Sequence, residues 1–287
     1  MEIISGLNQK KRHFCEIEIH SYLRDHCLEG KVILPAVESL ILLARAVKQN
    51  YPRTEINCLQ NAAFSRFLTI TQDIENQPVI VDVENSGSGI IAATLLTSMK
   101  SKTGTISREV EHARVEFCTI NPKEVVTHHF RVLDKLKGEC ISVPSTTIYR
   151  ELVPFGTAYR NIVGDLSVSS EGALAYLAGG DHEAAENLLG SPFPMDATMH
   201  AACVWGQRFA GIVSFPVGFE KRIIYQKTKK KEEYLGRVIP VNMTGDMLIF
   251  DAWIYKEDIM CEYIKGLKMK DVTRGRMHPP DWIKVNL

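Results

Sequence analysis

The same order of elements occurs twice in the sequence, and this repeat constrains the fold more than any other feature. Apolar residues recur at helical spacing over residues 35–47, and strand-like runs follow that stretch. A second helix-like stretch, at about 195–209, follows a strand-like run at 172–178 and is again succeeded by strand-like runs. These later runs are residues 79–83, 90–99 and 108–118 in the first half, and residues 234–241, 247–255 and 261–272 in the second. No residue-by-residue identity links the halves, so the repeat is one of architecture.

The repeat predicts two curled sheets, each around one helix. A sheet that curls around a helix buries the apolar face of that helix, and two such sheets can pair their open edges. The chain is therefore expected to be α+β, with two antiparallel sheets and two long core helices. A polar, irregular stretch at about 121–137 predicts an N-terminal unit of residues 1–135 and a C-terminal unit of residues 136–287.

Charge and cysteine usage exclude several classes of protein. Lysine and arginine total 34, as do aspartate and glutamate, so no net field attracts nucleic acid or an anionic membrane. No segment approaches the roughly 20 apolar residues of a membrane helix. Seven cysteines without CxxC spacing argue against a disulfide framework and a zinc ribbon, and predict small buried thiols. We expect a cytoplasmic protein with no metal site.

The first stretch that could carry chemistry precedes the first predicted helix. It holds His26, Gly30 and Pro35 in the form HxxxGxxxxP. Histidine is a base near neutral pH, glycine lets the backbone pass close to a ligand, and a helix N-terminus offers free N–H groups to a carbonyl oxygen. The combination suits proton removal beside a carbonyl. Each residue alone also fits a tight turn that leads into a helix.

The second stretch lies in the other half, where Asp196 and His200 stand one helical turn apart on the same face. An aspartate near a helix start with a histidine partner can be purely structural. If the two core helices face each other, however, an acid and a base meet across one cleft.

A third stretch, residues 149–160, places Phe155 and Tyr159 around Gly156 at the head of the second half. Such a stretch fits the lining of an acyl-pantetheine channel. An aromatic turn that packs between elements fits it equally well.

These three stretches, in this order, resemble the dehydratase domains of polyketide synthases and of polyunsaturated fatty acid synthases, which are double hotdogs. The likeness covers nearly the whole chain. It implies that His26 and Asp196 form the catalytic dyad and that His200 holds the aspartate. Gly30 and Pro35 match the first motif of that family, which places them beside the substrate.

One motif of the family is altered here. YGPxF stands as Phe155-Gly156-Thr157-Ala158-Tyr159, without the tyrosine hydroxyl and the proline of the family pattern. The departure concerns substrate positioning by Phe155, Gly156 and Tyr159 and leaves the dyad in place. Residues 213–219 also look like the short proline-containing strand that follows the second helix in this family.

The resemblance implies a lyase that removes water from a 3-hydroxyacyl thioester in polyketide or fatty acid biosynthesis. Neutral His26 would take the α-proton and protonated Asp196 would donate to the departing β-hydroxyl, with backbone N–H groups near Gly30 polarising the thioester carbonyl. No metal or organic cofactor is implied. The acyl group would be carried on the phosphopantetheine of an acyl carrier protein, or of a synthase carrying one, and family habit suggests a homodimer.

Other functions fit the same residues. A product-template-like cyclase would share the dyad and differ in the shape of its pocket. A non-catalytic acyl-binding or scaffold subunit would keep the fold and tolerate loss of the Asp196 carboxylate. A hotdog thioesterase would hydrolyse the thioester instead.

Overall fold

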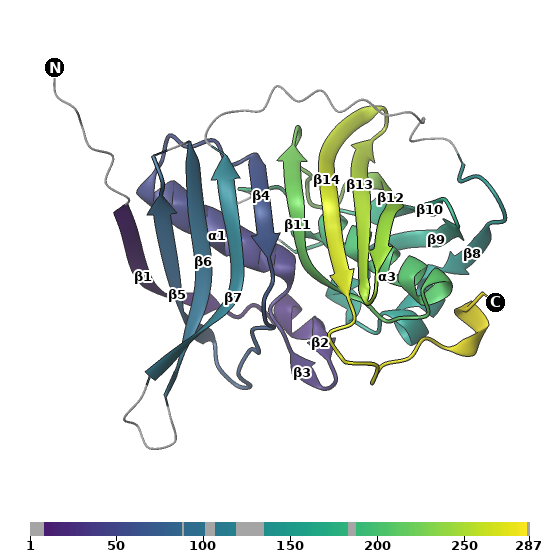
Figure 1. The fold of residues 1–287 in the computed structure, drawn as a ribbon, viewed down its shortest axis with the longest axis horizontal. Coiled ribbons are helices and arrows are strands. Elements are labelled where there is room, and N and C mark those ends of the chain that lie inside the picture. The colour runs from purple at the N-terminus through teal and green to yellow at the C-terminus, as the bar shows by residue number, and fades with distance from the viewer. Residues whose placement is uncertain (1–8, 88, 101–106, 119–134, 183–187, 286–287) are drawn as a thin grey trace.

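The computed structural model describes residues 9–87, 89–100, 107–118, 135–182 and 188–285 of the 287-residue chain. These residues form one 12-stranded antiparallel sheet with two long helices packed against it (Figure 1). The strand order is β1-β5-β6-β7-β4-β11-β14-β13-β12-β10-β9-β8. The first five strands in this order belong to the N-terminal half of the chain and the other seven to the C-terminal half.

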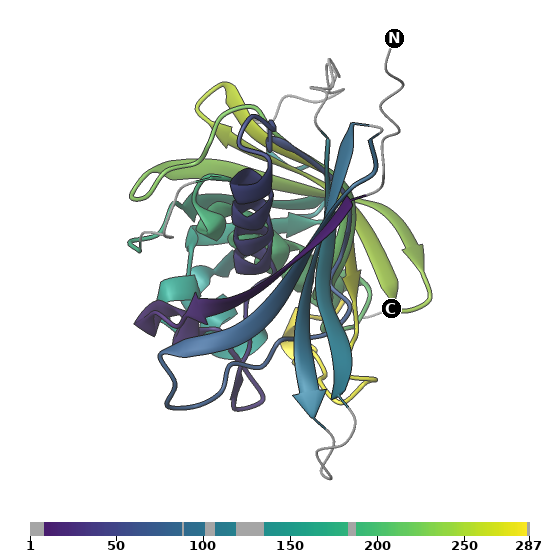
Figure 2. The same ribbon diagram turned by 90° about the vertical axis from the view of Figure 1, so that its left-hand side faces the viewer.

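The N-terminal half wraps its strands around helix α1. α1 covers Ala36–Asn50 and packs against β5, β6 and β7, as Figures 1 and 2 show. Its apolar residues recur at helical spacing, so Leu40, Leu43 and Val47 are fully buried on one face. The strands are β1 (Gln9–Glu18), β4 (Cys58–Ala63), β5 (Asn76–Asn85), β6 (Ile90–Lys100) and β7 (Ser107–Cys118).

The C-terminal half repeats this arrangement around helix α3, which covers Pro192–Phe209 and packs against β9 to β13. Ser191 caps the helix, accepting a hydrogen bond from the Phe193 N–H, and Pro192 occupies the first helical position, where no N–H is needed. The strands are β8 (Ile141–Pro144), β9 (Ile162–Ser169), β10 (Gly172–Ala178), β11 (Phe215–Ile224), β12 (Glu233–Thr244), β13 (Met247–Lys256) and β14 (Ile259–Lys270).

The two halves meet where β4 pairs with β11. In this antiparallel pair Leu59 lies opposite Arg222 and Gln60 lies opposite Lys221. The pairing joins two half-sheets into one and leaves β1 and β8 as the only edges of the sheet that the described strands build. α1 and α3 also touch, so both core helices approach the same region from opposite halves.

Short elements fill the space between the halves. Three are 3₁₀ turns: η1 (Ser21–Asp25), η3 (Thr157–Tyr159) and η4 (Asp281–Ile283). The others are the hairpin of β2 (Cys27–Leu28) and β3 (Lys31–Val32), and the helical turns α2 (Ser145–Thr147) and η2 (Ile148–Leu152). η1 contacts η3, which brings the chain before α1 against the head of the second half.

Both predicted core helices are present, and the predicted strands correspond to β5, β6, β7, β10, β12, β13 and β14. The expected short strand at 213–219 is the start of a longer strand, β11. The boundary at 135/136 adjoins residues 119–134, which lie outside the described residues, so this boundary stays a prediction. Within the described part of the chain, no helix is long and apolar enough to cross a membrane.

Candidate active site

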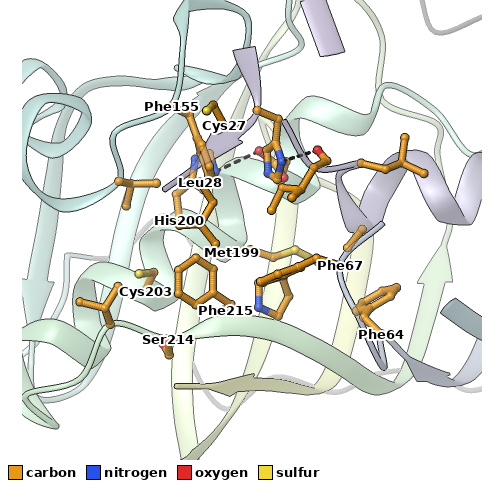
Figure 3. Close-up of a pocket in the computed structure, with 18 of the residues that line it drawn as sticks. Cys27, Leu28, Phe64, Phe67, Phe155, Met199, His200, Cys203, Ser214 and Phe215 are labelled. Atoms are coloured by element: carbon orange, nitrogen blue, oxygen red, sulfur yellow. Dashed lines mark hydrogen bonds and ion pairs between the residues drawn. The ribbon is translucent and has the colours of Figure 1, made fainter. Parts of the chain in front are cut away.

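A pocket between the two halves collects residues from both of them. It encloses about 1000 Å³ of empty space, part of which is open to solvent, and most of its lining is apolar. Figure 3 shows His200 and Cys203 on one side, Phe64 and Phe67 on the other, and Met199 and Phe215 between them. The polar lining includes His26 from the first half and Asp196 from the second.

The ring of His26 is held in a single orientation by the hairpin that follows it. Its Nδ1 lies 2.9 Å from the carbonyl oxygen of Ile33, while the Ile33 N–H donates to the His26 carbonyl. Because a carbonyl can only accept, Nδ1 carries the ring proton and Nε2 of the neutral ring is left as an acceptor. Burial lowers the pKa of His26 to about 4, and the Asp196 carboxylate opposes part of that shift. His26 is therefore neutral at physiological pH, as a general base must be.

Two aromatic rings pack on the imidazole of His26. Phe155 stacks on it with a centroid separation of 4.2 Å, and Tyr159 meets it edge-on at 5.0 Å. Phe155 also lies 5.2 Å from the His200 ring, so it stands between the histidines of the two halves. The altered YGPxF stretch is thus part of the wall around His26, and Phe155 lines the pocket.

Gly156 lets this aromatic stretch approach the turn before His26. Its N–H donates to the Asp25 carbonyl at 2.7 Å, and the Ala158 N–H donates to the Asp25 carboxylate at 2.8 Å. A Cβ atom on Gly156 would lie 2.5 Å from Cγ of Asp25, closer than such atoms can come. Only glycine therefore fits this position while Asp25 keeps its place.

Asp196 and His200 form a close contact inside α3. Nε2 of His200 lies 3.0 Å from Oδ2 of Asp196, and both residues are 4% exposed. The separation is that of an ion pair, although the two atoms are not aligned for a hydrogen bond. The expected placement of His200 beside the aspartate is therefore observed.

Tyr149 lies beside the other ring nitrogen of His200. The Tyr149 hydroxyl accepts a hydrogen bond from the Ile162 N–H at 2.8 Å and lies 3.4 Å from Nδ1 of His200. Since that hydroxyl already accepts from Ile162, it can donate its own proton to Nδ1. In that arrangement Nε2 of a neutral His200 carries the ring proton, on the side of the ring that is nearer to Asp196.

Of the five residues expected beside the substrate, only Phe155 lines the pocket. Gly30 is exposed at the turn of the β2–β3 hairpin, where it and Glu29 have φ of +75° and +47°. Pro35 is the residue at the N-terminus of α1. Neither lines the pocket, and Tyr159 packs behind His26 without lining it. Gly30 serves a tight turn that favours left-handed backbone conformations, and Pro35 serves the start of a helix.

Other pocket residues were not singled out from the sequence. Met199 and Cys203 follow Asp196 at helical spacing on the same face of α3, which was a readable signal. Phe67, Phe215 and Met277 come from loops and strand starts far apart in the chain, and no local pattern marks them. Within the described residues, no cluster of three or more histidine, cysteine, aspartate or glutamate side chains could hold a metal ion.

Comparison with known proteins identifies the fold. No protein-family model matches the sequence, and no curated protein matches it. Among solved structures, the dehydratase domain from the CurF module of the curacin polyketide synthase superposes with a TM-score of 0.72 at 18% identity, covering 93% of this chain and 95% of that one. An N-terminal dehydratase from the difficidin assembly line gives 0.69 at 14% identity, with coverages of 92% and 94%.

A third similar structure, the bifunctional dehydratase-cyclase domain of ambruticin biosynthesis, gives a TM-score of 0.65 at 15% identity and covers 91% of each chain. The chain therefore has the double-hotdog fold of polyketide synthase dehydratase domains. The resemblance that the three motifs predicted is confirmed at the level of the fold.

Proposed function

We propose that this protein is a dehydratase that removes water from a 3-hydroxyacyl thioester and leaves an enoyl thioester. The observation that carries the proposal is the pairing, in one apolar pocket, of a neutral His26 with a buried Asp196 from the opposite half. An elimination of this type needs a base at the α-carbon and an acid at the β-oxygen, and the pocket offers one of each.

In the proposed reaction, each residue of the dyad moves one proton. Nε2 of His26 takes the α-proton, the electrons of the broken C–H bond form the double bond, and the C–O bond at the β-carbon breaks. The carboxylic acid of Asp196 donates its proton to the departing hydroxyl, which leaves as water. His200 holds the Asp196 carboxyl in place. The hydrogen bond from Nδ1 of His26 to the Ile33 carbonyl fixes the orientation of the His26 ring.

The lining of the pocket supports an acyl substrate. Met199, Phe155 and Phe215 offer apolar surface to a hydrocarbon chain, and the opening to solvent admits a substrate on a long arm. We propose that the acyl group arrives on the phosphopantetheine of an acyl carrier protein or a synthase, in polyketide or fatty acid biosynthesis. We further propose that the protein works in the cytoplasm, as a homodimer and without metal or organic cofactor.

A cyclase is the second candidate, because the chain is similar in structure to a bifunctional dehydratase-cyclase domain. The same base and acid would then act on a longer chain that folds back on itself. A non-catalytic acyl-binding subunit would leave the thioester unchanged, and a thioesterase would release the free acid. One assay of the products therefore separates all four functions.

The experiment is mass-spectrometric analysis of products from a panel of 3-hydroxyacyl and poly-β-keto thioesters, on pantetheine and on carrier protein. Wild type is compared with His26→Ala and Asp196→Asn, and His278→Ala serves as the matched control because His278 is exposed and outside the pocket. Loss of water by wild type and the control, and by neither dyad variant, supports the proposal. Cyclised product, free acid, or no product from a folded wild type would instead favour the cyclase, the thioesterase or the binding subunit.

A further inference from the structure

Two cysteines face each other outside the pocket, next to the strand pair that joins the two halves. β4 and β7 are antiparallel, with Leu59 opposite Phe117 and Gln60 opposite Glu116. Continued by one residue along both strands, this register places Cys58 opposite Cys118. The described strands thus bring together two thiols that lie far apart in the sequence of the N-terminal half.

The pleat of the sheet places both thiols on its outer face. Leu59 and Phe117 are fully buried in the core, and side chains of a strand alternate between faces. Cys58 and Cys118 therefore point away from the core, on the same side. Directly opposed residues in antiparallel strands have Cα atoms about 4.5–5.5 Å apart, and a disulfide needs Cα atoms about 4.4–6.8 Å apart, so the backbone spacing suits a disulfide.

The two thiols differ in access and in acidity. Cys58 is 1% exposed, whereas Cys118 is half-buried and reachable from solvent. Protonated Cys118 donates to Oε1 of Gln60 at 3.1 Å, and ionised Cys118 accepts a hydrogen bond from the Cys58 thiol. That bond lowers the pKa of Cys118 to about 7, against the effect of burial, with Lys221 on β11 assisting and Glu116 opposing. The lowered pKa favours the thiolate form of Cys118, which is the nucleophilic form of a cysteine.

We propose that Cys58 and Cys118 form an oxidisable thiol pair, in which Cys118 attacks a low-molecular-weight disulfide such as oxidised glutathione and Cys58 resolves the product. The Cys118 thiolate attacks one sulfur of the glutathione disulfide, and the S–S bond breaks to release one glutathione thiolate. Cys58 passes its proton to that thiolate and attacks Sγ of Cys118, which releases the second glutathione. Two protein thiols are oxidised and one glutathione disulfide is reduced.

The division of roles follows from the geometry. The attacking thiol must be reachable from solvent and readily ionised, which describes Cys118, and the resolving thiol needs only to be adjacent, which describes Cys58. The disulfide would tie β4 to β7 beside the β4–β11 pairing that joins the halves. This inference stands apart from the proposed dehydratase function, because neither cysteine lines the pocket.

The test uses the full chain with Cys140→Ser, because Cys140 is exposed and would take glutathione by itself. The protein is incubated with oxidised glutathione at neutral pH, remaining thiols are alkylated, and peptides are mapped by mass spectrometry with and without reductant. We expect a cross-linked Cys58–Cys118 peptide, lighter by two hydrogen atoms than the two free peptides and released by reductant.

Two further variants separate the steps. Cys118→Ser should abolish the cross-link, and Cys58→Ser should leave a stable glutathione adduct on Cys118. A persistent adduct on Cys118 in the protein that retains Cys58 would overturn the resolving role of Cys58. Alkylation of both thiols after exposure to oxidised glutathione would overturn the pair altogether.

Discussion

Helices α1 and α3 occupy equivalent places in the two halves, yet they differ in how far water reaches them. α1 keeps Gln49 exposed and Arg45 and Lys48 half-buried, while its other face enters the core. In α3, every residue from Pro192 to Gln207 is buried. α3 packs against strands on one side and against α1, η2 and η3 on others, so no face remains for solvent.

This difference separates the environments of Asp196 and His26, the proposed acid and base. Asp196 sits inside the enclosed helix, where polar groups depend on neighbours such as His200 and Tyr149. His26 sits ahead of the more open helix, beside a hairpin whose turn is exposed. One half thus supplies a buried carboxyl in the pocket lining, and the other supplies an imidazole whose orientation a backbone carbonyl determines.

The largest expected effect comes from removing either member of the dyad. His26→Ala and Asp196→Asn should each slow dehydration by about 10²–10⁴-fold, because each deletes a proton transfer. If the two halves act as one catalytic unit, the double variant should be about as slow as the slower single variant. Steady-state rates of enoyl thioester formation provide the measurement. If the rate loss of the double variant equalled the product of the two single losses, the two halves would act independently.

A matched pair of substitutions tests the enclosure of α3. Ala202→Leu adds bulk to a fully buried site on α3 and should destabilise the fold by about 1–3 kcal/mol. Gln49→Leu adds an apolar side chain at an exposed site on α1 and should change stability by less than about 0.5 kcal/mol. Urea denaturation of both variants gives the comparison. Equal costs would contradict the difference between the helices.

Tyr149→Phe tests how the enclosed half orients its acid. The variant leaves the buried Ile162 N–H without an acceptor and should lose about 1–3 kcal/mol of stability. It also frees His200 from the tautomer that faces Asp196, so kcat should fall while KM stays unchanged. Tyr176→Phe is the control, because Tyr176 is exposed on β10. A stability loss with unaltered kcat would assign Tyr149 a purely structural role.

The smallest effect near neutral pH concerns the titration of His26. Its pKa of about 4 predicts that kcat/KM stays level as pH falls below 6.5 and declines only as pH approaches 4. The unfolded chain binds a proton at His26 below about pH 6.5, where the folded chain does not. The stability linked to neutral His26 is thus complete above about pH 6.5 and is lost progressively as pH falls toward 4.

Rate profiles and unfolding free energies between pH 4 and pH 8 check both expectations for His26. His26→Ala should lose less stability than wild type over the acidic part of this range. If kcat/KM instead fell as the pH dropped through about 6.5, the ordinary pKa of histidine, burial would not lower the pKa of His26 during the reaction.

Local sequence pattern determined the two helices, most of the strands and the three stretches that bear chemistry. Helical spacing marked α1 and α3, and the runs of β-branched and aromatic residues marked β12, β13 and β14. The motifs around His26, ahead of α1, and Asp196, within α3, marked both as candidates, and their roles as a dyad are what the family resemblance implies. The strands β1, β4, β8 and β9 were missed: β4, for instance, is short and reads CLQNAA, with little β-forming composition.

Only the tertiary structure decided what surrounds those side chains. The pairing of β4 with β11 joins residues more than half the chain apart, and no local pattern encodes it. The same holds for Phe155 between two histidines, for Tyr149 behind His200, and for Gly30 at an exposed turn away from the pocket. Residue types reveal which chemistry is available, because that chemistry resides in the side chain. Burial, orientation and protonation state depend on groups brought together from both halves, and these exist only once the sheet has closed.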